Sequence, residues 1–259
     1  MHFERLNLGK ENYLREFGGL FEREIMKFED PLTLETISHE ILEKIDPRSI
    51  DQILNIVVST LQQERQKRNE ERFKSLNLEE AIDELFKTSS ASHAILCAVN
   101  GREDFKKVFN IFERFIREKK IEENDGRILY IREVINRNIK IYDIEIELLK
   151  IDAKRRIGEL KKDNSFFEQS LPQLESLIPV ISEFLNYYKE NDILSKPEEV
   201  KNLIEEIERY LELIENKNYD LIREKFYDFC LNLSTLRNIY FEELEVKQIR
   251  ENVKDLVKF

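Results

Sequence analysis

Residues 127–162, RILYIREVINRNIKIYDIEIELLKIDAKRRIGELKK, decide the fold of this chain. No proline interrupts the stretch, and its apolar side chains recur at helical spacing on two stripes. The first stripe contains Ile131, Ile135, Ile139, Tyr142, Ile146, Leu149, Ala153, Ile157 and Leu160, and the second contains Val134, Ile141, Ile144, Leu148 and Ile151. A helix that is apolar on two sides packs between neighbours. At 1.5 Å per residue it is roughly 50 Å long, so we expect it to form the centre of the molecule.

A strand is the alternative for part of this stretch. Residues 138–151, NIKIYDIEIELLKI, are rich in isoleucine and alternate in part between apolar and polar side chains, which is typical of a strand. Tyr142 and Asp143 break the alternation without supplying a turn. The sequence therefore favours the helix.

The composition indicates the same fold class. The chain has 259 residues with only 6 glycines and 5 prolines, while 37% of its residues are charged, which favours long helices over a turn-rich β fold. We predict an all-α protein, either a multi-helix bundle or a helical-repeat-like array around the helix at 127–162. The turn residues 124–126 predict a boundary between an N-terminal helical subdomain, 1–125, and a C-terminal helical subdomain, 126–259, with one continuous domain as the alternative.

Local signals predict where the other helices begin and end. Caps and capping boxes satisfy the free backbone N–H groups of a first turn. The predicted starts are the cap and proline pairs Asp30-Pro31 and Asp46-Pro47, and the capping boxes Asn77/Glu80, Ser165/Glu168 and Ser195/Glu198. Asn100-Gly101 is predicted to end a short helix, and Pro179 to kink or split another. The last helices are expected at 196–215, 219–232 and 235–258.

Several classes of protein are disfavoured by what the sequence lacks. Cys97 and Cys230 are too few for a disulfide framework, which fits a reducing compartment. No apolar run reaches the ~18 residues of a membrane span, and acidic residues stand where a signal peptide has its apolar segment. We expect a soluble cytoplasmic protein. Because the glycine-rich nucleotide loops and the serine-hydrolase and zinc-protease motifs are absent, no catalytic residue is assigned and no cofactor is predicted.

The two candidates for metal ligands are His93 and Cys97. They are four residues apart and share one face of a helix, which is half of a metal site. His39 and Cys230, or a carboxylate, would have to complete it from distant helices. We therefore interpret His93 and Cys97 as a histidine and a cysteine at a crossing of two helices. A helical carboxylate metalloenzyme is kept as a second alternative function.

The distribution of charge along the chain points to a binding function. The net charge is −11, but residues 1–100, 101–162 and 163–259 carry −6, +4 and −9. The central segment contains two basic clusters, which are candidates for binding nucleic acid or another anion. The first cluster is Arg114, Arg117, Lys119 and Lys120, and the second is Lys154, Arg155, Arg156, Lys161 and Lys162.

These observations predict a non-enzymatic helical scaffold or regulatory protein that binds another macromolecule through grooves between helices and through charged faces. A protein is the first choice of partner, and self-association is a further option. An accessory subunit of nucleic-acid machinery that uses the two basic clusters is the main alternative. The abundance of isoleucine, glutamate and lysine favours a thermophilic source, although 19 asparagines weaken that inference.

Overall fold

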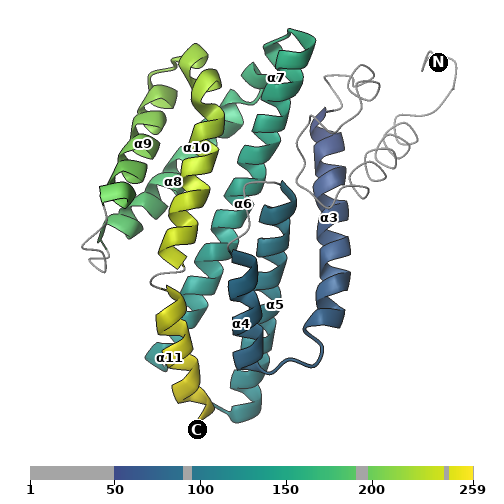
Figure 1. Ribbon diagram of the computed structural model, residues 1–259, viewed down its shortest axis with the longest axis vertical. Helices are drawn as coiled ribbons and strands as arrows, with labels where there is room; N and C mark the ends of the chain where they lie inside the picture. The colour runs from purple at the N-terminus through teal and green to yellow at the C-terminus, as the bar shows by residue number, and fades with distance from the viewer. Residues whose placement is uncertain (1–49, 90–94, 191–197, 242–244, 259) are drawn as a thin grey trace, which may run out of the picture.

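Helix α6 (Gly126–Lys161) is the longest helix of the described residues and runs through the middle of the molecule (Figure 1). Oδ1 of Asp125 caps its start by accepting a hydrogen bond from the backbone N–H of Arg127 at 2.9 Å. It ends at Lys162, which has a left-handed φ of 55°. Asp163 then donates its backbone N–H to the Gly158 carbonyl at 2.8 Å, which closes the last turn. The predicted helix is confirmed, and the strand alternative is wrong.

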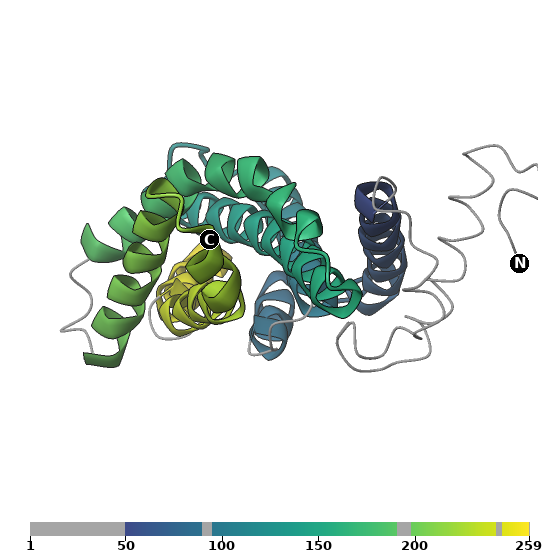
Figure 2. The same ribbon diagram turned by 90° about the horizontal axis from the view of Figure 1, so that it is seen from above.

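The computed structural model describes residues 50–89, 95–190, 198–241 and 245–258, and within these ranges all regular structure is helical. Besides α6, the helices are α3 (Ile50–Arg72), α4 (Leu78–Ser89), α5 (Ile95–Lys119), α7 (Ser165–Glu168), α8 (Leu171–Glu190), α9 (Glu198–Glu215), α10 (Tyr219–Tyr240) and α11 (Val246–Val257). They form an all-α bundle, as the composition predicts. Seen from above, α3 and α9 lie on opposite sides of the bundle (Figure 2).

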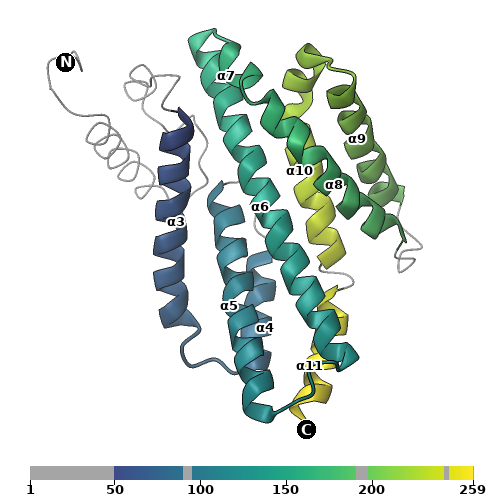
Figure 3. The same ribbon diagram turned by 180° about the vertical axis from the view of Figure 1, so that it is seen from behind.

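Two hydrophobic cores share α6, because each of its apolar stripes faces a different set of helices. The first core contains α3, α4, α5 and α11, and the second contains α8, α9 and α10 (Figure 3). From α6, the first core takes Ile131, Ile135, Tyr142, Ile146 and Ile157, and the second takes Ile141, Ile144, Leu148 and Ile151. The two stripes are confirmed for the side chains that the structure describes, which excludes that of Leu160, except that Val134 packs in the first core. The predicted subdomain boundary at residue 125 stays a prediction.

The C-terminal end of the chain differs from the prediction. A break was expected between 232 and 235, but α10 continues to Tyr240 because Leu233 and Leu236 are buried in the second core. The helix changes at Phe241 and Glu245, where the backbone is π-helical. Beyond this joint α11 packs against α4 and α6. The last helix of the chain therefore completes the first core.

Gly101 does not end a helix, contrary to the prediction. Helix α5 continues through it from Ile95 to Lys119. A Cβ atom at position 101 would lie 2.3 Å from Cζ of Tyr142. The glycine therefore allows the close approach of α5 to α6 rather than a turn.

Of the remaining predictions of helix starts and breaks, one is confirmed and others are wrong or lie outside the described residues. The capping box at Asn77 and Glu80 is confirmed, since each backbone N–H donates to the other residue's side chain at 2.9 Å. No such box forms at Ser165, whose backbone N–H donates to Asp163 instead at 3.0 Å. Helix α8 is not split at Pro179, which lies on its exposed side. The starts predicted at Asp30-Pro31, Asp46-Pro47 and Ser195 lie outside the described residues.

Candidate interaction surface

The second basic cluster is largely occupied by contacts within the protein. Lys154 is buried, and its Nζ pairs with Asp51 of α3. Arg155 and Arg156 both pair with buried Asp152, at 2.7 Å and 2.8 Å. The guanidinium of Arg156 also lies 5.3 Å from the ring centroid of Tyr227. These three cations neutralise internal carboxylates, which leaves less positive charge for an external anion.

The last two members of that cluster lie at the end of α6. Nζ of Lys161 lies 5.8 Å from the centroid of the Phe166 ring. Lys162 is exposed and adopts the left-handed conformation that ends the helix. Cations in the last turn also stabilise a helix through its dipole. A structural role accounts for both lysines.

The first basic cluster is exposed at the C-terminal end of α5. The side chain of Arg114 is 57% exposed and lies 4.0 Å from Glu118, while Nε of Arg117 donates to the Glu113 carbonyl of its own helix at 3.2 Å. Lys119 and Lys120 are exposed as well. The two clusters therefore lie near opposite ends of α6 and are not brought together (Figure 1).

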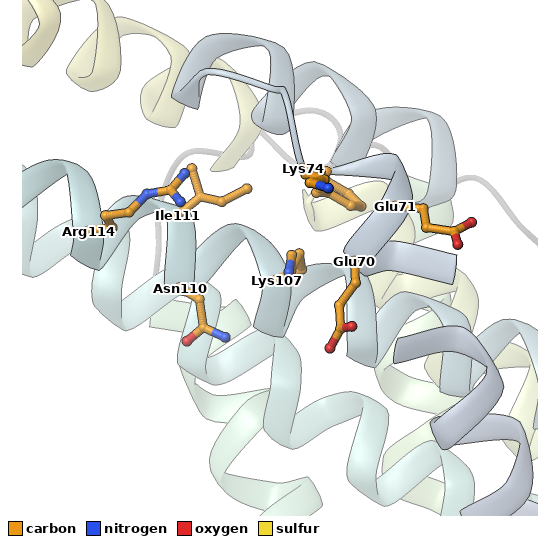
Figure 4. Close-up of a pocket in the computed structure, with 8 residues that line it drawn as sticks. Glu70, Glu71, Lys74, Lys107, Asn110, Ile111 and Arg114 are labelled. Atoms are coloured by element: carbon orange, nitrogen blue, oxygen red, sulfur yellow. The ribbon is translucent and has the colours of Figure 1, made fainter. Parts of the chain in front are cut away.

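A pocket of about 450 Å³ adjoins the first cluster, between α5 and the end of α3. Figure 4 shows the acidic side chains on the α3 side and the side chains of Lys107 and Arg114 on the α5 side. We call this pocket the α3–α5 groove; it is lined by Glu70, Glu71, Phe73, Lys74, Lys107, Asn110, Ile111 and Arg114. Arg114 is the one residue of the groove that belongs to a predicted cluster.

The charged side chains that line the groove differ from other charged side chains of α3 in whether they form ion pairs. Arg65 of α3 holds the buried carboxylate of Asp104 through bonds of 2.7 and 2.8 Å, and Arg72 pairs with Glu84 at 2.5 Å. Within the described part of the chain, by contrast, neither acid of the groove nor either of its lysines forms an ion pair. The groove therefore presents charge of both signs to the solvent.

A buried ion pair joins α6 to the start of α11. Nη1 of Arg137 donates to Oε1 of Glu245 at 2.8 Å, and Nδ2 of Asn138 donates to Oε2 at 2.9 Å. The guanidinium of Arg137 stacks 3.4 Å from the ring centroid of Tyr187 on α8. Burial raises the pKa of Glu245 to about 7, against the opposing effect of Arg137. Both carboxylate oxygens of Glu245 are therefore bound by side chains of α6, which fits a structural role where α11 meets α6.

A second buried pair joins α6 to α10. Nε of Arg237 donates to Glu145 at 2.7 Å, and its Nη1 donates to the hydroxyl of Tyr142 at 2.8 Å. Burial raises the pKa of the Tyr142 hydroxyl to about 12. Burial also raises the pKa of the nearby Cys230 thiol, which keeps it protonated and disfavours nucleophilic chemistry.

The candidate metal ligands fall outside what the structure describes. This applies to His93 and to the side chain of Cys97, and also to His39. Among the described residues, no group of three or more histidine, cysteine, aspartate or glutamate side chains is arranged to hold a metal ion. No described helix is long and apolar enough to cross a membrane.

The fold defines the class: an all-α multi-helix bundle built on a shared central helix. No protein-family model matches the chain, and comparisons with curated proteins and with solved structures gave no significant match.

Proposed function

We propose that the protein is a non-enzymatic cytoplasmic scaffold that binds a protein partner through the α3–α5 groove. The observation that supports this is the set of charged side chains of both signs that line one hollow without pairing to each other. Elsewhere many charged groups are consumed in ion pairs within the chain, as Asp104 and Asp152 are. A surface with both signs of charge favours a partner that also carries both signs.

The acidic side of the groove separates a protein partner from a polyanion. Glu70 and Glu71 lie beside Lys107, so that a phosphate backbone tracking along the groove would meet two carboxylates. A protein segment can offer a base to these carboxylates and an acid to the lysine. The groove therefore fits a protein better than it fits nucleic acid.

Nucleic acid stays the second candidate, because the cations of the groove continue into the first basic cluster. Lys107 and Arg114 are followed along α5 by Arg117, Lys119 and Lys120, all without a buried carboxylate partner among the described residues. A nucleic acid bound there would lose affinity steeply as salt is raised.

The test is to capture the native partner with the full-length protein and to compare matched variants. The groove variant is Lys107→Glu/Arg114→Glu, and the control, Lys201→Glu/Arg209→Glu, makes the same charge change on the exposed face of α9. We expect one protein partner to bind the wild type and the control and to bind the groove variant at least about tenfold more weakly. Treatment with nucleases should leave the complex intact.

Two results would overturn the proposal. One is a partner that the groove variant retains with unchanged affinity. The other is bound material that nucleases remove, which would support the nucleic-acid function instead. Circular dichroism of both variants checks that they fold, as expected for substitutions of partly or fully exposed side chains.

A further inference from the structure

The second half of α3 is polar along its whole length. The first half buries apolar side chains, Leu54 and Leu61 among them, in the first core. Residues 62–72, QQERQKRNEER, contain no apolar residue, and the next one, Phe73, is buried just after the helix ends. Burial of apolar surface, the main driving force for packing, therefore contributes little to holding this polar half against its neighbours. Two of its residues, Glu70 and Glu71, line the α3–α5 groove.

The polar half is attached to α5 through one carboxylate. Asp104 is fully buried, and Nη2 of Arg65 donates to both of its oxygens, at 2.8 and 2.7 Å. Nδ2 of Asn69 donates to Oδ1 at 2.7 Å, and Nη1 of Arg72 lies 3.4 Å from Oδ2. Within the described part of the chain, every hydrogen-bond partner of this carboxylate belongs to α3. The ion pair of Arg72 with Glu84 of α4 is partly exposed, so we expect it to contribute less.

This carboxylate lies directly next to both sides of the groove. Lys107 and Ile111, which line the groove from α5, follow Asp104 by three and seven residues and so share its face of the helix. On the other side, Asn69 immediately precedes Glu70. The contact with Asp104 therefore joins the two helices one turn away from the residues that form the groove.

Such a buried contact fixes a position more than it stabilises a fold. The cost of removing the charges from water offsets much of their attraction. Oδ1 of Asn69 adds to this cost, because it is buried and has no hydrogen-bond partner among the described residues. The bonds that Arg65 makes through two of its nitrogens are directional, however, and allow one arrangement of α3 on α5.

We infer that Asp104 is a positioning residue of the α3–α5 groove: its carboxylate holds the polar half of α3 beside Lys107, although Asp104 itself does not line the groove. In its bearing on binding, this inference rests on the proposed function. Loss of the contact should release residues 62–72 while Leu61 and Phe73, the apolar residues on either side, stay buried. The rest of the bundle should remain folded.

Amide hydrogen exchange of the full-length protein tests this with a matched pair of variants. Arg65→Gln removes the main partner of Asp104, and Arg68→Gln makes the same change in charge at an exposed position of the same polar half. We expect the amides of 62–72 to lose protection at least about tenfold in Arg65→Gln and less than about twofold in Arg68→Gln. Asp104→Asn should reproduce the effect of Arg65→Gln.

A third variant separates a local contact from the general stability of the fold. Phe226→Ala weakens the second core, far from α3, and should lower the protection of the slowest amides elsewhere. The amides of 62–72 should change less than about twofold in this variant, because they exchange through a local opening that leaves Phe226 buried. Circular dichroism of all the variants checks that they fold.

Two exchange results would overturn the inference. One is unchanged protection of 62–72 in both Arg65→Gln and Asp104→Asn. The other is a loss at 62–72 in Phe226→Ala as large as that of the slowest amides, which would show that the cores hold this half.

Binding gives the second readout, with the partner that the wild type captures. Arg65→Gln should bind it at least about threefold more weakly than Arg68→Gln does. If Lys107→Glu/Arg114→Glu loses the partner while Arg65→Gln keeps it at full affinity, the proposed function stands and the positioning role is wrong. If Lys107→Glu/Arg114→Glu keeps it as well, the proposed function is wrong, and the exchange results alone decide whether Asp104 holds the polar half of α3.

Discussion

Tyr142 shows how one side chain sets the geometry of the centre. Its ring belongs to the first core, 5.6 Å from the ring centroid of Phe105, while its hydroxyl accepts a hydrogen bond from Arg237 on α10. Gly101 of α5 lies against the same ring, with no space for a Cβ atom. The distance between α5 and α6 therefore depends on the absence of a side chain at position 101.

The substitution Gly101→Ala tests this contact. Its Cβ would meet atoms of a fully buried ring that cannot move aside, so we expect a loss of about 1–3 kcal/mol in the free energy of unfolding, despite the better helix propensity of alanine. Gly126→Ala is the matched control, because nothing lies within 4 Å of a Cβ there. Urea denaturation measures both, and an equal effect at the two positions would contradict this account.

Glu245 is the residue whose ionisation should be visible in the stability of the protein. Its pKa is raised from 4.5 to about 7 because burial disfavours the carboxylate. Between these two pH values the folded chain holds a proton that the unfolded chain has released, so this group's contribution favours folding at low pH and is lost as pH rises towards 7. The full change is roughly 3 kcal/mol.

The measurement is the free energy of unfolding of the wild type and of Glu245→Gln from pH 5 to pH 8. Other carboxylates contribute equally to both proteins, so the difference between the two curves isolates position 245. We expect the wild type to lose stability relative to the variant as the pH is raised, with most of the change complete near pH 7. Two parallel curves would show that Glu245 has an ordinary pKa.

At the scale of elements, a line of buried polar residues runs along α6 where the two cores meet. Asn138, Glu145 and Asp152 are spaced by seven residues and are all buried. The first two bond to Glu245 and Arg237, which are eight residues apart on the chain. Glu245, directly before α11, and Arg237, near the end of α10, therefore both face α6.

The Arg237–Glu145 pair provides the test of this line. Removing one partner leaves the other charge buried, so Arg237→Met should cost about 3–5 kcal/mol, and Glu145→Met a similar amount. The double variant leaves no unpaired charge, and we expect it to be more stable than either single variant. A complete double-mutant cycle by urea denaturation measures this coupling, and additive losses would show that the pair is not a unit.

The sequence predicts the elements better than the contacts between them. The two apolar stripes of α6 and the capping box at Asn77 follow from local spacing, and both are present. The break near residue 233 was predicted wrongly, because Leu233 and Leu236 are buried in a core that α10 forms with α6 and α9, which local patterns do not report. The buried polar line was missed for a similar reason, since polar residues between apolar stripes are normally solvated.

At the scale of the whole molecule, the candidate site could be predicted only in part. The spacing of Lys107 and Arg114 on one face of α5 is visible in the sequence, and so is the mixed-charge run that contains Glu70 and Glu71. The sequence does not show that folding places this mixed-charge run, at the end of α3, beside Lys107 and Arg114 of α5. It also does not show that Lys154 is paired across the bundle with α3, so both basic clusters look equally exposed before folding.

The sharing of α6 by two cores predicts that the molecule unfolds as one unit. Each apolar stripe of α6 packs against a different set of helices. Unfolding of either core therefore exposes one side of α6, the helix on which the other core also depends. Phe105→Ala in the first core and Phe226→Ala in the second should each cost about 3–5 kcal/mol. We expect both variants to give a single urea transition with a lowered midpoint.

Hydrogen exchange distinguishes this from two independent halves. In Phe105→Ala, the slowest amides of α9 and α10 should lose protection by the same factor as those of α5, although position 105 lies in the other core. Phe226→Ala should produce the reciprocal effect on α4 and α5. If α9 and α10 kept their wild-type protection in Phe105→Ala, the second core would be stable without the first, and α6 would be a connector between two domains rather than their common centre.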